Sequence, residues 1–334
     1  MMIAAAAIRA FRLQRKRRPR ANMALPSSLA ASDKITSPSP FTSLPMFSYR
    51  HAFHAGNHAD VLKHMVLVQL LAYLNQKETA YMVVDTHAGA GVYTLDGDYA
   101  TKSGEAAEGI AKLWDRKDLP EAVAAYVDEI RAMNPAGKLR HYPGSPFLSE
   151  RLMREQDRLR LFELHSTDSK LLAENIRKLE AHAAANGQRS RGKRILAERS
   201  DGFGALKALL PPPSRRALVL IDPPYEDKDD YRKVRAALEE AQKRFATGTY
   251  AVWYPVLGRL ESQQLPERLK RVAQGDWLHV TLSIGAPDAE GRGLVASGMF
   301  IINPPWTLAA TLKDTMPWLV QALARDTSAR FTLQ

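Results

Sequence analysis

Residues 218–225 read LVLIDPPY: four apolar residues, an acid, two prolines and an aromatic ring. A near-copy, MFIINPPW, occupies residues 299–306. An uninterrupted apolar run is typical of a strand that is buried on both faces of a sheet. The two prolines then fix the backbone immediately after the strand. The fold decides which of the two copies, with Asp222 or with Asn303, lies where a ligand can bind.

Strand-like and helical segments alternate from residue 46 onward. Helical stretches separate the first six strand candidates, which indicates a mostly parallel, doubly wound sheet. The segment GAPDAEGRGLVAS before the last strand has no helical face, so that strand should pair antiparallel. The seven expected strands are YMVVD (81–85), RLFEL (160–164), RILAE (194–198), ALVLID (217–222), TYAVWYPV (249–256), LHVTLSI (278–284) and GMFIIN (298–303).

A seven-stranded, mostly parallel sheet with an antiparallel last strand describes the α/β, Rossmann-like fold of class I S-adenosylmethionine-dependent methyltransferases. About 75 residues separate the first two strands, far more than a crossover needs. Part of this span, about 97–143, contains the helical patterns EAAEGIAKLWDR and PEAVAAYVDEIRAM. We therefore expect a methyltransferase domain over residues 46–334 that carries a small helical insertion.

Composition limits the class of protein. The chain has 334 residues, a formal net charge of +11 and no cysteine, which excludes disulfides, thiolate metal sites and a cysteine nucleophile. A cytoplasmic or similarly reducing location fits this composition. No uncharged apolar run reaches 18 residues, so we expect no membrane span.

The first 45 residues differ from the rest. They hold eight Lys or Arg residues and one acid, so they contribute +7 of the net charge and leave +4 to the remainder. Their Ala/Arg-rich and Ser/Pro/Thr-rich sequence shows no sustained periodicity, which predicts disorder. Three interpretations stay open: a basic extension, an organelle transit peptide, or a start codon assigned too early, with Met46 as the true beginning.

A glycine turn follows the first strand in VVDTHAGAGVYTL (83–95). Gly89 and Gly91 allow a tight turn and close approach to a ligand, whereas Thr94 weakens a dinucleotide fingerprint. Glu163 ends the second strand, where a carboxylate can accept both ribose hydroxyls. Asp201 follows the third strand, where an acid can meet an adenine amine. Together they predict a nucleoside-bearing cofactor at the carboxyl edge of the sheet.

Four histidines, His51, His54, His58 and His64, lie close together in SYRHAFHAGNHADVLKH (48–64). Zinc is one interpretation, but the spacing does not supply the required geometry, so we expect no metal. Solvated or capping histidines are a second interpretation. A third is a polar lid over the cofactor, with Tyr49, Arg50 and Lys63 facing a substrate.

The DPPY corner suits the chemistry of an exocyclic amine. The Asp222 carboxylate and a proline carbonyl can accept its two N–H protons, which keeps the nitrogen lone pair out of the ring. The amine could then attack a sulfonium methyl in line, and Tyr225 could stack on a flipped base. Such catalysis depends mainly on positioning and electrostatics.

Several segments, in order, resemble the bacterial RlmJ family, whose members are 23S ribosomal RNA adenine-N6 methyltransferases. The resemblance covers about residues 46–320, and the family's own start resembles Met46. RSRGKR (189–194) departs from the family pattern. The matching segments are MFSYRHAFHAGNHADVLKH, DTHAGAG, YPGSP, ELH, DGF, LIDPPYE, WYPV and ASGMFIINPPW.

The resemblance implies S-adenosyl-L-methionine as cofactor and 23S ribosomal RNA, naked or in an early assembly intermediate, as partner. It makes Asp222 the catalytic residue, Tyr49 a substrate contact and Lys63 a helper on the substrate side. The cofactor contacts that it implies are His64, His87, Ser145, Glu163, Asp201, Gly202 and Asp222.

Two other functions stay open on the sequence alone. A DNA adenine or protein glutamine methyltransferase would share the [DN]PP[YFW] device, although Asp222 favours adenine. A non-catalytic RNA-binding protein would not need acids at 163, 201 and 222. NPPW should end an antiparallel strand, so we expect Asn303 at the opposite edge of the sheet, as a strand stop before a helix.

Overall fold

The computed structural model describes residues 54–95, 104–185, 193–288 and 293–334. The expectations for residues 1–45, Tyr49 and His51, and most of the basic segment 189–194, therefore concern parts of the chain outside the described residues.

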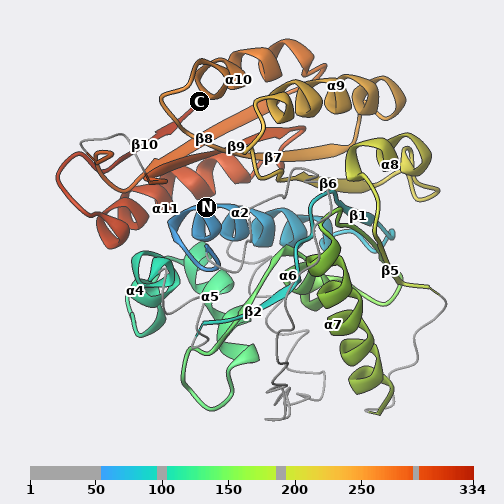
Figure 1. The fold of residues 1–334 in the computed structure, drawn as a ribbon, viewed down its shortest axis with the longest axis horizontal. Coiled ribbons are helices and arrows are strands. Elements are labelled where there is room, and N and C mark those ends of the chain that lie inside the picture. Colours follow the sequence, from blue (N-terminus) through green and yellow to red (C-terminus); the bar gives the residue numbers. More distant parts are fainter. Residues whose placement is uncertain (1–53, 96–103, 186–192, 289–292) are drawn as a thin grey trace, which may run out of the picture.

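An eight-stranded sheet forms the centre of the described chain (Figure 1). The strand order is β10-β8-β9-β7-β6-β1-β4-β5. The strands are β1 (Met82–Asp85), β4 (Arg158–Phe162), β5 (Ile195–Glu198), β6 (Ala217–Ile221), β7 (Thr249–Pro255), β8 (Trp277–Ser283), β9 (Ala296–Ile302) and β10 (Arg330–Leu333).

The directions of the strands confirm the fold expected from the sequence. Strands β5, β4, β1, β6 and β7 are parallel, whereas β9 runs antiparallel to both of its neighbours, β7 and β8. The expected number of seven strands was wrong, because β10 adds an eighth, antiparallel to β8 at the sheet edge. Four residues that alternate between exposed and half-buried positions give only a weak strand pattern.

Helices cover both faces of the sheet (Figure 1). One face carries α8 (Gly202–Leu209), α9 (Asp229–Arg244) and α10 (Leu260–Val272), with α9 packed against both others. The other face carries α2 (His58–Leu74), α6 (Ser145–Leu152), α7 (Ser166–Ala185) and α11 (Leu308–Leu323). This three-layer arrangement buries the apolar strands on both sides.

Helix α2 lies inside the protein rather than on its surface. All residues from His58 to Leu71 are buried, and the helix packs against α5, α6, α11 and β9. A helix that is surrounded by protein needs apolar residues all around its axis, and its sequence supplies them. The Asn57 side chain caps it by accepting the N–H groups of Ala59 and Asp60.

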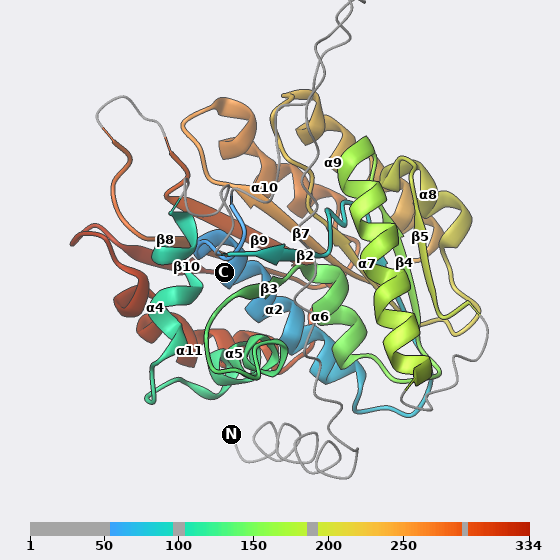
Figure 2. The ribbon, with the colours of Figure 1, turned by 60° about the horizontal axis from the view of Figure 1, so that its bottom comes forward.

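A short antiparallel ribbon of β2 (Val92–Thr94) and β3 (His141–Pro143) stands apart from the main sheet. Between its strands lie the 3-10 helix η2 (Glu105–Glu108), α4 (Ile110–Trp114) and α5 (Glu121–Met133), within the segment expected to be helical. Figures 1 and 2 show the ribbon and α5 on the α2 side of the sheet. The Tyr142 hydroxyl joins them, because it bonds to the Tyr126 hydroxyl at 2.9 Å and to His64 Nδ1 at 2.7 Å.

Candidate active site

The carboxyl ends of three adjacent parallel strands, β6, β1 and β4, bring three acids together. Asp85 ends β1, and its register partners are Leu220 in β6 and Leu161 in β4. Asp222 and Glu163 each follow their strand's partner by two residues, so all three carboxylates lie at one edge of the sheet. This is the edge at which open α/β sheets bind ligands.

A buried ion-pair cluster surrounds Asp222. The Lys63 ammonium on α2 lies 2.5 Å from Asp222 Oδ2 and 2.9 Å from Asp60 Oδ1. The side chains of Lys63 and Asp222 are only 4% and 12% exposed. Burial lowers the pKa of Lys63, but Asp222 and Asp60 more than offset this, so its pKa lies above the ordinary value. Lys63 is therefore a permanent cation beside Asp222.

Asp85 belongs to the site, although the sequence analysis did not name it as a site residue. Its carboxylate is buried and accepts a hydrogen bond from the Ser145 hydroxyl at 2.6 Å and one from the His87 N–H at 3.3 Å. Burial, with a further contribution from the charge of Asp222, raises the pKa of Asp85 to about 6. An acid that ends the first strand just before a glycine turn was the signal that could have identified it.

The glycine turn after β1 is held by Glu163. The Gly89 N–H donates to Glu163 Oε2 and the His165 N–H donates to Oε1, both at 2.7 Å. Gly89 and Gly91 have φ angles of +58° and +83°, which side-chain-bearing residues rarely adopt. Burial raises the pKa of Glu163, although these two N–H groups act in the opposite direction. Each carboxylate oxygen keeps a second lone pair that can accept a ligand hydroxyl.

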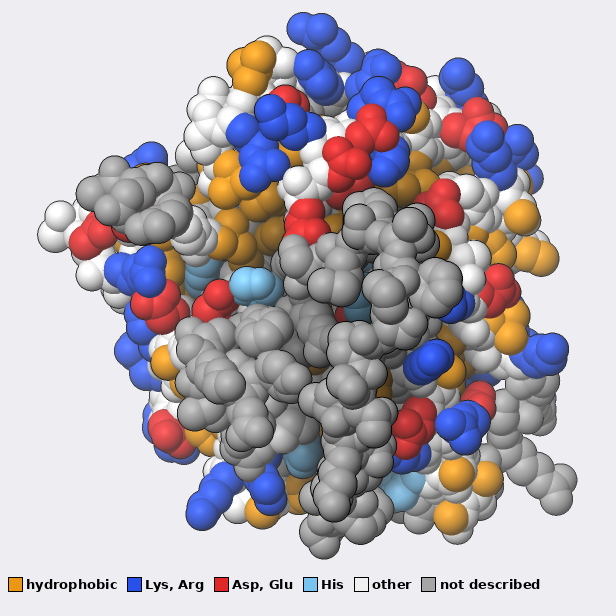
Figure 3. Space-filling model, in the orientation of Figure 1, with side chains coloured by type: hydrophobic (Ala, Val, Ile, Leu, Met, Phe, Trp, Pro, Cys, Tyr) orange, Lys and Arg blue, Asp and Glu red, His pale blue; other side chains and the backbone are white. Residues whose placement is uncertain are grey.

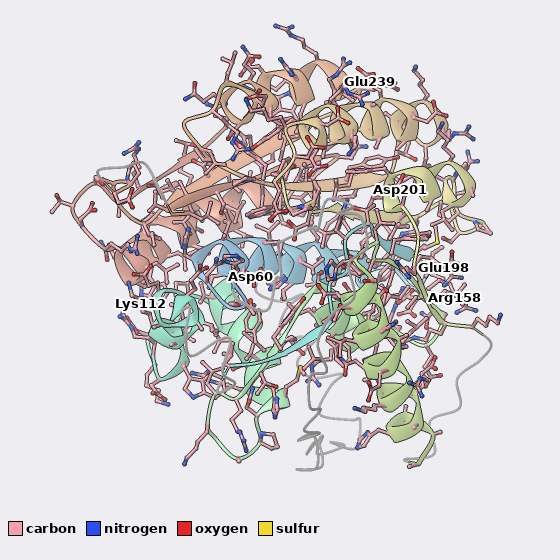
Figure 4. The ribbon with its side chains drawn as sticks, in the orientation of Figure 1. Asp60, Lys112, Arg158, Glu198, Asp201 and Glu239 are labelled. Carbon is pink, nitrogen blue, oxygen red and sulfur yellow. The ribbon has the colours of Figure 1, made fainter. Side chains whose placement is uncertain are left out.

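Asp201 lies just before α8 at the same edge (Figure 4), and Gly202 is the first residue of that helix. Asp201 caps the helix by accepting the N–H groups of Phe203 and Gly204, both at 3.1 Å. A Cβ on Gly202 would lie 2.2 Å from the Thr86 carbonyl oxygen, so no other residue fits this approach of α8 to β1. Asp201, the acid predicted to meet the adenine amine, is therefore also the N-cap of α8.

The described histidines form two groups: His87 and His64 are predicted cofactor contacts, whereas His54 and His58 lie near Glu105. His87 follows β1, and burial lowers its pKa to about 3, so its ring is neutral; the ring packs edge-on against Phe203. His64 is buried in α2, where its Nδ1 meets Tyr142. His54 pairs with Glu105 at 2.8 Å, and burial lowers the pKa of His58 to about 4. Within the described ranges, no three potential metal ligands form a group.

Tyr225, expected to stack on a base, is 1% exposed. Its hydroxyl donates to the Trp253 carbonyl at 2.8 Å, and its ring packs against Tyr231. The backbone is left-handed at φ +53°, and the Arg259 guanidinium donates to the Tyr225 carbonyl at 3.2 Å. In this structure the ring anchors the DPPY corner in the core, and Arg259 holds it from the outer side.

Asn303 lies at the opposite edge of the sheet, as expected. Its neighbour Ile302 pairs with Tyr250 near the start of β7, whereas Asp222 follows the end of β6. The Asn303 amide donates to the carbonyls of Ala246 and Gly248, both at 2.7 Å. NPPW therefore joins the β9 end to the loop before β7 and contributes nothing to the acidic edge.

The strand directions and the acids gathered at the carboxyl edge of this sheet define a Rossmann-like methyltransferase. The family model described as "Ribosomal RNA large subunit methyltransferase D, RlmJ" matches residues 78–333. The chain belongs to the RlmJ family of ribosomal RNA large subunit methyltransferases, as the resemblance in its motifs indicated.

Two curated relatives carry the name Ribosomal RNA large subunit methyltransferase J. The Haemophilus influenzae protein is 46% identical over 290 residues, which cover 86% of this chain and 98% of the relative. The Escherichia coli protein is 46% identical over 274 residues, covering 82% and 93%. A crystal structure of a Legionella pneumophila protein aligns with a TM-score of 0.73 at 33% identity, covering 84% of this chain and 98% of that one.

No helix in the described part of the chain is long and apolar enough to cross a membrane.

Proposed function

We propose that this protein transfers a methyl group from S-adenosylmethionine to the N6 amine of an adenine in 23S ribosomal RNA. The observation that carries the proposal is Asp222, which is fixed by Pro223 and Pro224 at the acidic carboxyl edge and paired with a buried lysine. Membership of the RlmJ family supports the substrate class.

The donor set fits this cofactor. Among the described residues, Asp85 and Asp222 at the carboxyl edge face one ammonium, that of Lys63, so these three side chains carry a net negative charge when both acids are ionised. A negative cluster favours a ligand with an ammonium and a sulfonium. When bound, S-adenosylmethionine supplies an electrophilic methyl group on sulfur.

The residues proposed to hold the cofactor come from four strand ends and three helices, α2, α6 and α8. Glu163 would accept the ribose hydroxyls, and Asp201 the adenine amine. Gly202 leaves room for close backbone packing next to them. We add Asp85 to the predicted contacts, because its carboxylate lies between Ser145 and His87. The full set is His64, Asp85, His87, Ser145, Glu163, Asp201, Gly202 and Asp222.

Asp222 accepts hydrogen bonds from the target amine and does not remove a proton from it. Its carboxylate and a proline carbonyl accept the N–H protons of the target amine, which leaves the nitrogen lone pair available for attack. A carboxylate that pairs with a cation is a weak base. The amine therefore keeps its protons until the methyl group has been transferred, and one proton then passes to solvent.

On the substrate side, we propose that Tyr49, which lies outside the described residues, contacts RNA. Figure 3 shows Lys and Arg interspersed with Asp and Glu over α9 and α10. Pairs such as Arg232 with Asp229 and Arg244 with Glu240 neutralise much of this surface. We also propose a cytoplasmic location, and a boundary between a basic extension, residues 1–45, and a methyltransferase domain, residues 46–334.

The test is transfer of labelled methyl from S-adenosylmethionine to ribosomal RNA from cells that lack this protein. Naked 23S RNA and large-subunit assembly particles are compared, and the label is mapped by digestion and mass spectrometry. N6-methyladenosine at one position of 23S RNA is expected. Label in DNA or protein but not in RNA, or in RNA at another atom, contradicts the proposal.

A further inference from the structure

Asp60 is a buried acid that is neither a proposed cofactor contact nor a proposed substrate contact. It lies in the first turn of α2, two residues after the first residue of the helix, and its carboxylate is 2% exposed (Figure 4). One oxygen, Oδ2, accepts the Gly56 N–H at 2.9 Å and so helps to cap the helix. The other, Oδ1, lies 2.9 Å from the Lys63 ammonium. A single side chain thus joins the start of α2 to the cation beside Asp222.

The placement of Lys63 creates a need for this acid. Burial disfavours the charged ammonium. Residues three apart lie on the same helix face, so Asp60 reaches Lys63 without distortion. The Trp253 ring, with its centroid 5.7 Å from Nζ, adds an apolar surface with weak affinity for a cation.

We propose that Asp60 is a positioning residue for methyl transfer, which holds the Lys63 ammonium between two carboxylates and thereby sets its contact with Asp222. This role rests on the proposed function of the site. Because Lys63 divides its donors between Asp60 and Asp222, it steadies Asp222 without moving fully onto it. Asp222 oxygens then stay oriented for the target amine.

Loss of the Asp60 charge would change this arrangement in two ways. Lys63 would lose one of two carboxylates and move toward Asp222, where it would compete with the amine. Its ammonium would also be less stable in a buried site, so its pKa would fall. At alkaline pH Lys63 would then lose its proton, and Asp222 would lose the cation beside it.

Among the described residues that feel the charge of Lys63, Asp85, Tyr93 and Tyr126 titrate outside the range expected for a lysine. Asp85 of β1 has a pKa of about 6, on the acidic side, because it is buried. Burial raises the pKa of Tyr93 in β2 and of Tyr126 in α5 well above the ordinary value. A new loss of activity between about pH 8 and 10 would therefore report on Lys63.

The experiment compares two substitutions at one position with a matched control. Asp60→Asn removes the charge but keeps an oxygen that can cap the helix. Asp60→Glu keeps both the charge and the cap. The control is Asp229→Asn, since Asp229 also lies in the first turn of a helix and pairs three residues on with Arg232, at 2.6 Å, but on an exposed surface.

Single-turnover methylation and cofactor affinity are measured from pH 6 to 10. Asp60→Asn is expected to lower the rate about tenfold to a hundredfold near neutral pH and further at alkaline pH, with cofactor affinity changed less than threefold. Asp60→Glu should recover most of the rate, and Asp229→Asn should match the wild type. A wild-type rate in Asp60→Asn, or an equal loss at every pH that Asp60→Glu does not recover, overturns the proposal.

A second readout does not require activity. The side-chain ammonium signal of Lys63 is followed by nitrogen NMR as the pH rises, in the wild type and in Asp60→Asn. The signal should disappear at a lower pH in the variant. If it does so while wild-type protein fails to methylate ribosomal RNA, the proposed function is wrong and the ion-pair arrangement stands. If both proteins titrate alike, Asp60 does not set the state of Lys63.

Discussion

The two Pro-Pro corners of this protein have nearly the same sequence and opposite surroundings. At DPPY the acid faces a buried cation, and the aromatic residue Tyr225 is 1% exposed. At NPPW the amide bonds to two backbone carbonyls, and Trp306 is 70% exposed. Each corner contains one left-handed residue, Tyr225 at φ +53° and Asn303 at φ +52°. Both motifs therefore make a stiff exit from a strand. Whether such a motif can take part in catalysis depends on which edge of the sheet it occupies.

The largest difference should appear when the first residue of DPPY is replaced. Asp222→Ala removes the acceptor of the target amine and leaves Lys63 with one carboxylate. We expect methyl transfer to fall at least about a thousandfold while the protein stays folded. Single-turnover methylation, with circular dichroism as the control for folding, measures this. A folded but inactive Asn303→Ala beside an active Asp222→Ala would reverse the assignment of the two corners.

The corresponding change at NPPW should affect stability instead. Asn303→Ala removes two amide hydrogen bonds and places alanine at a left-handed φ. We expect a loss of about 2–3 kcal/mol in the free energy of unfolding, with activity retained below the melting transition. Denaturant unfolding measures this loss. Asn303→Gly tolerates the left-handed φ and should be less destabilised, which separates backbone strain from the lost hydrogen bonds.

The stability of the folded protein should depend on pH through a buried acid at the carboxyl edge. Asp85 at the carboxyl edge has a pKa of about 6 in the folded protein, against 3.8 for the ordinary carboxyl. The folded state binds its proton more tightly, so its contribution to stability is full below about pH 4 and is lost as the pH rises to about 6. The change is on the order of 3 kcal/mol.

Urea unfolding at several pH values measures this contribution. Asp85→Asn should remove most of the fall in stability between pH 4 and 6, because the amide does not titrate. A bound cation should favour the ionised carboxyl, so cofactor binding near pH 6 should release protons. Calorimetry in buffers of different ionisation enthalpy detects that release. An unchanged profile in Asp85→Asn would assign the pH dependence to another group.

The smallest effect is expected from removing residues 1–45. Both corners and all acids of the carboxyl edge lie within residues 46–334, and the family match begins at residue 78. A chain of residues 46–334 should methylate RNA at the full-length rate, within about twofold, in a side-by-side assay at low and at physiological salt. A large loss of activity would show that the basic segment belongs to the enzyme.

The separation of the two corners could be predicted because it depends on one local rule. A connection without a helix cannot return a strand in parallel, so the direction of β9 followed from the segment before it. The positions of Glu163, Asp201 and Asp222 then followed from the strand ends. The eighth strand was missed because β10 is short and is completed only by pairing with β8.

Side-chain direction was harder to predict than edge position. After two prolines, an aromatic ring can face the crevice or the core, and nothing local decides between them. Tyr225 packs inward because Tyr231 and the Trp253 carbonyl, both distant from it along the fold, lie there. The Asp60–Lys63 pair could have been predicted, since an acid three residues before a lysine on a buried helix needs a partner.

The burial of α2 has a consequence for biosynthesis. This helix carries Lys63 and is made early, yet it packs against β9 and α11, which are made last. About 220 residues separate the end of α2 from the start of β9, so at about 5–20 residues per second they follow after roughly 10–45 s. During that interval a nascent chain has α2 with α5 and α6 but lacks β9 and α11, so one side of the helix is uncovered. The cation needed at Asp222 is therefore in place only when translation is nearly complete.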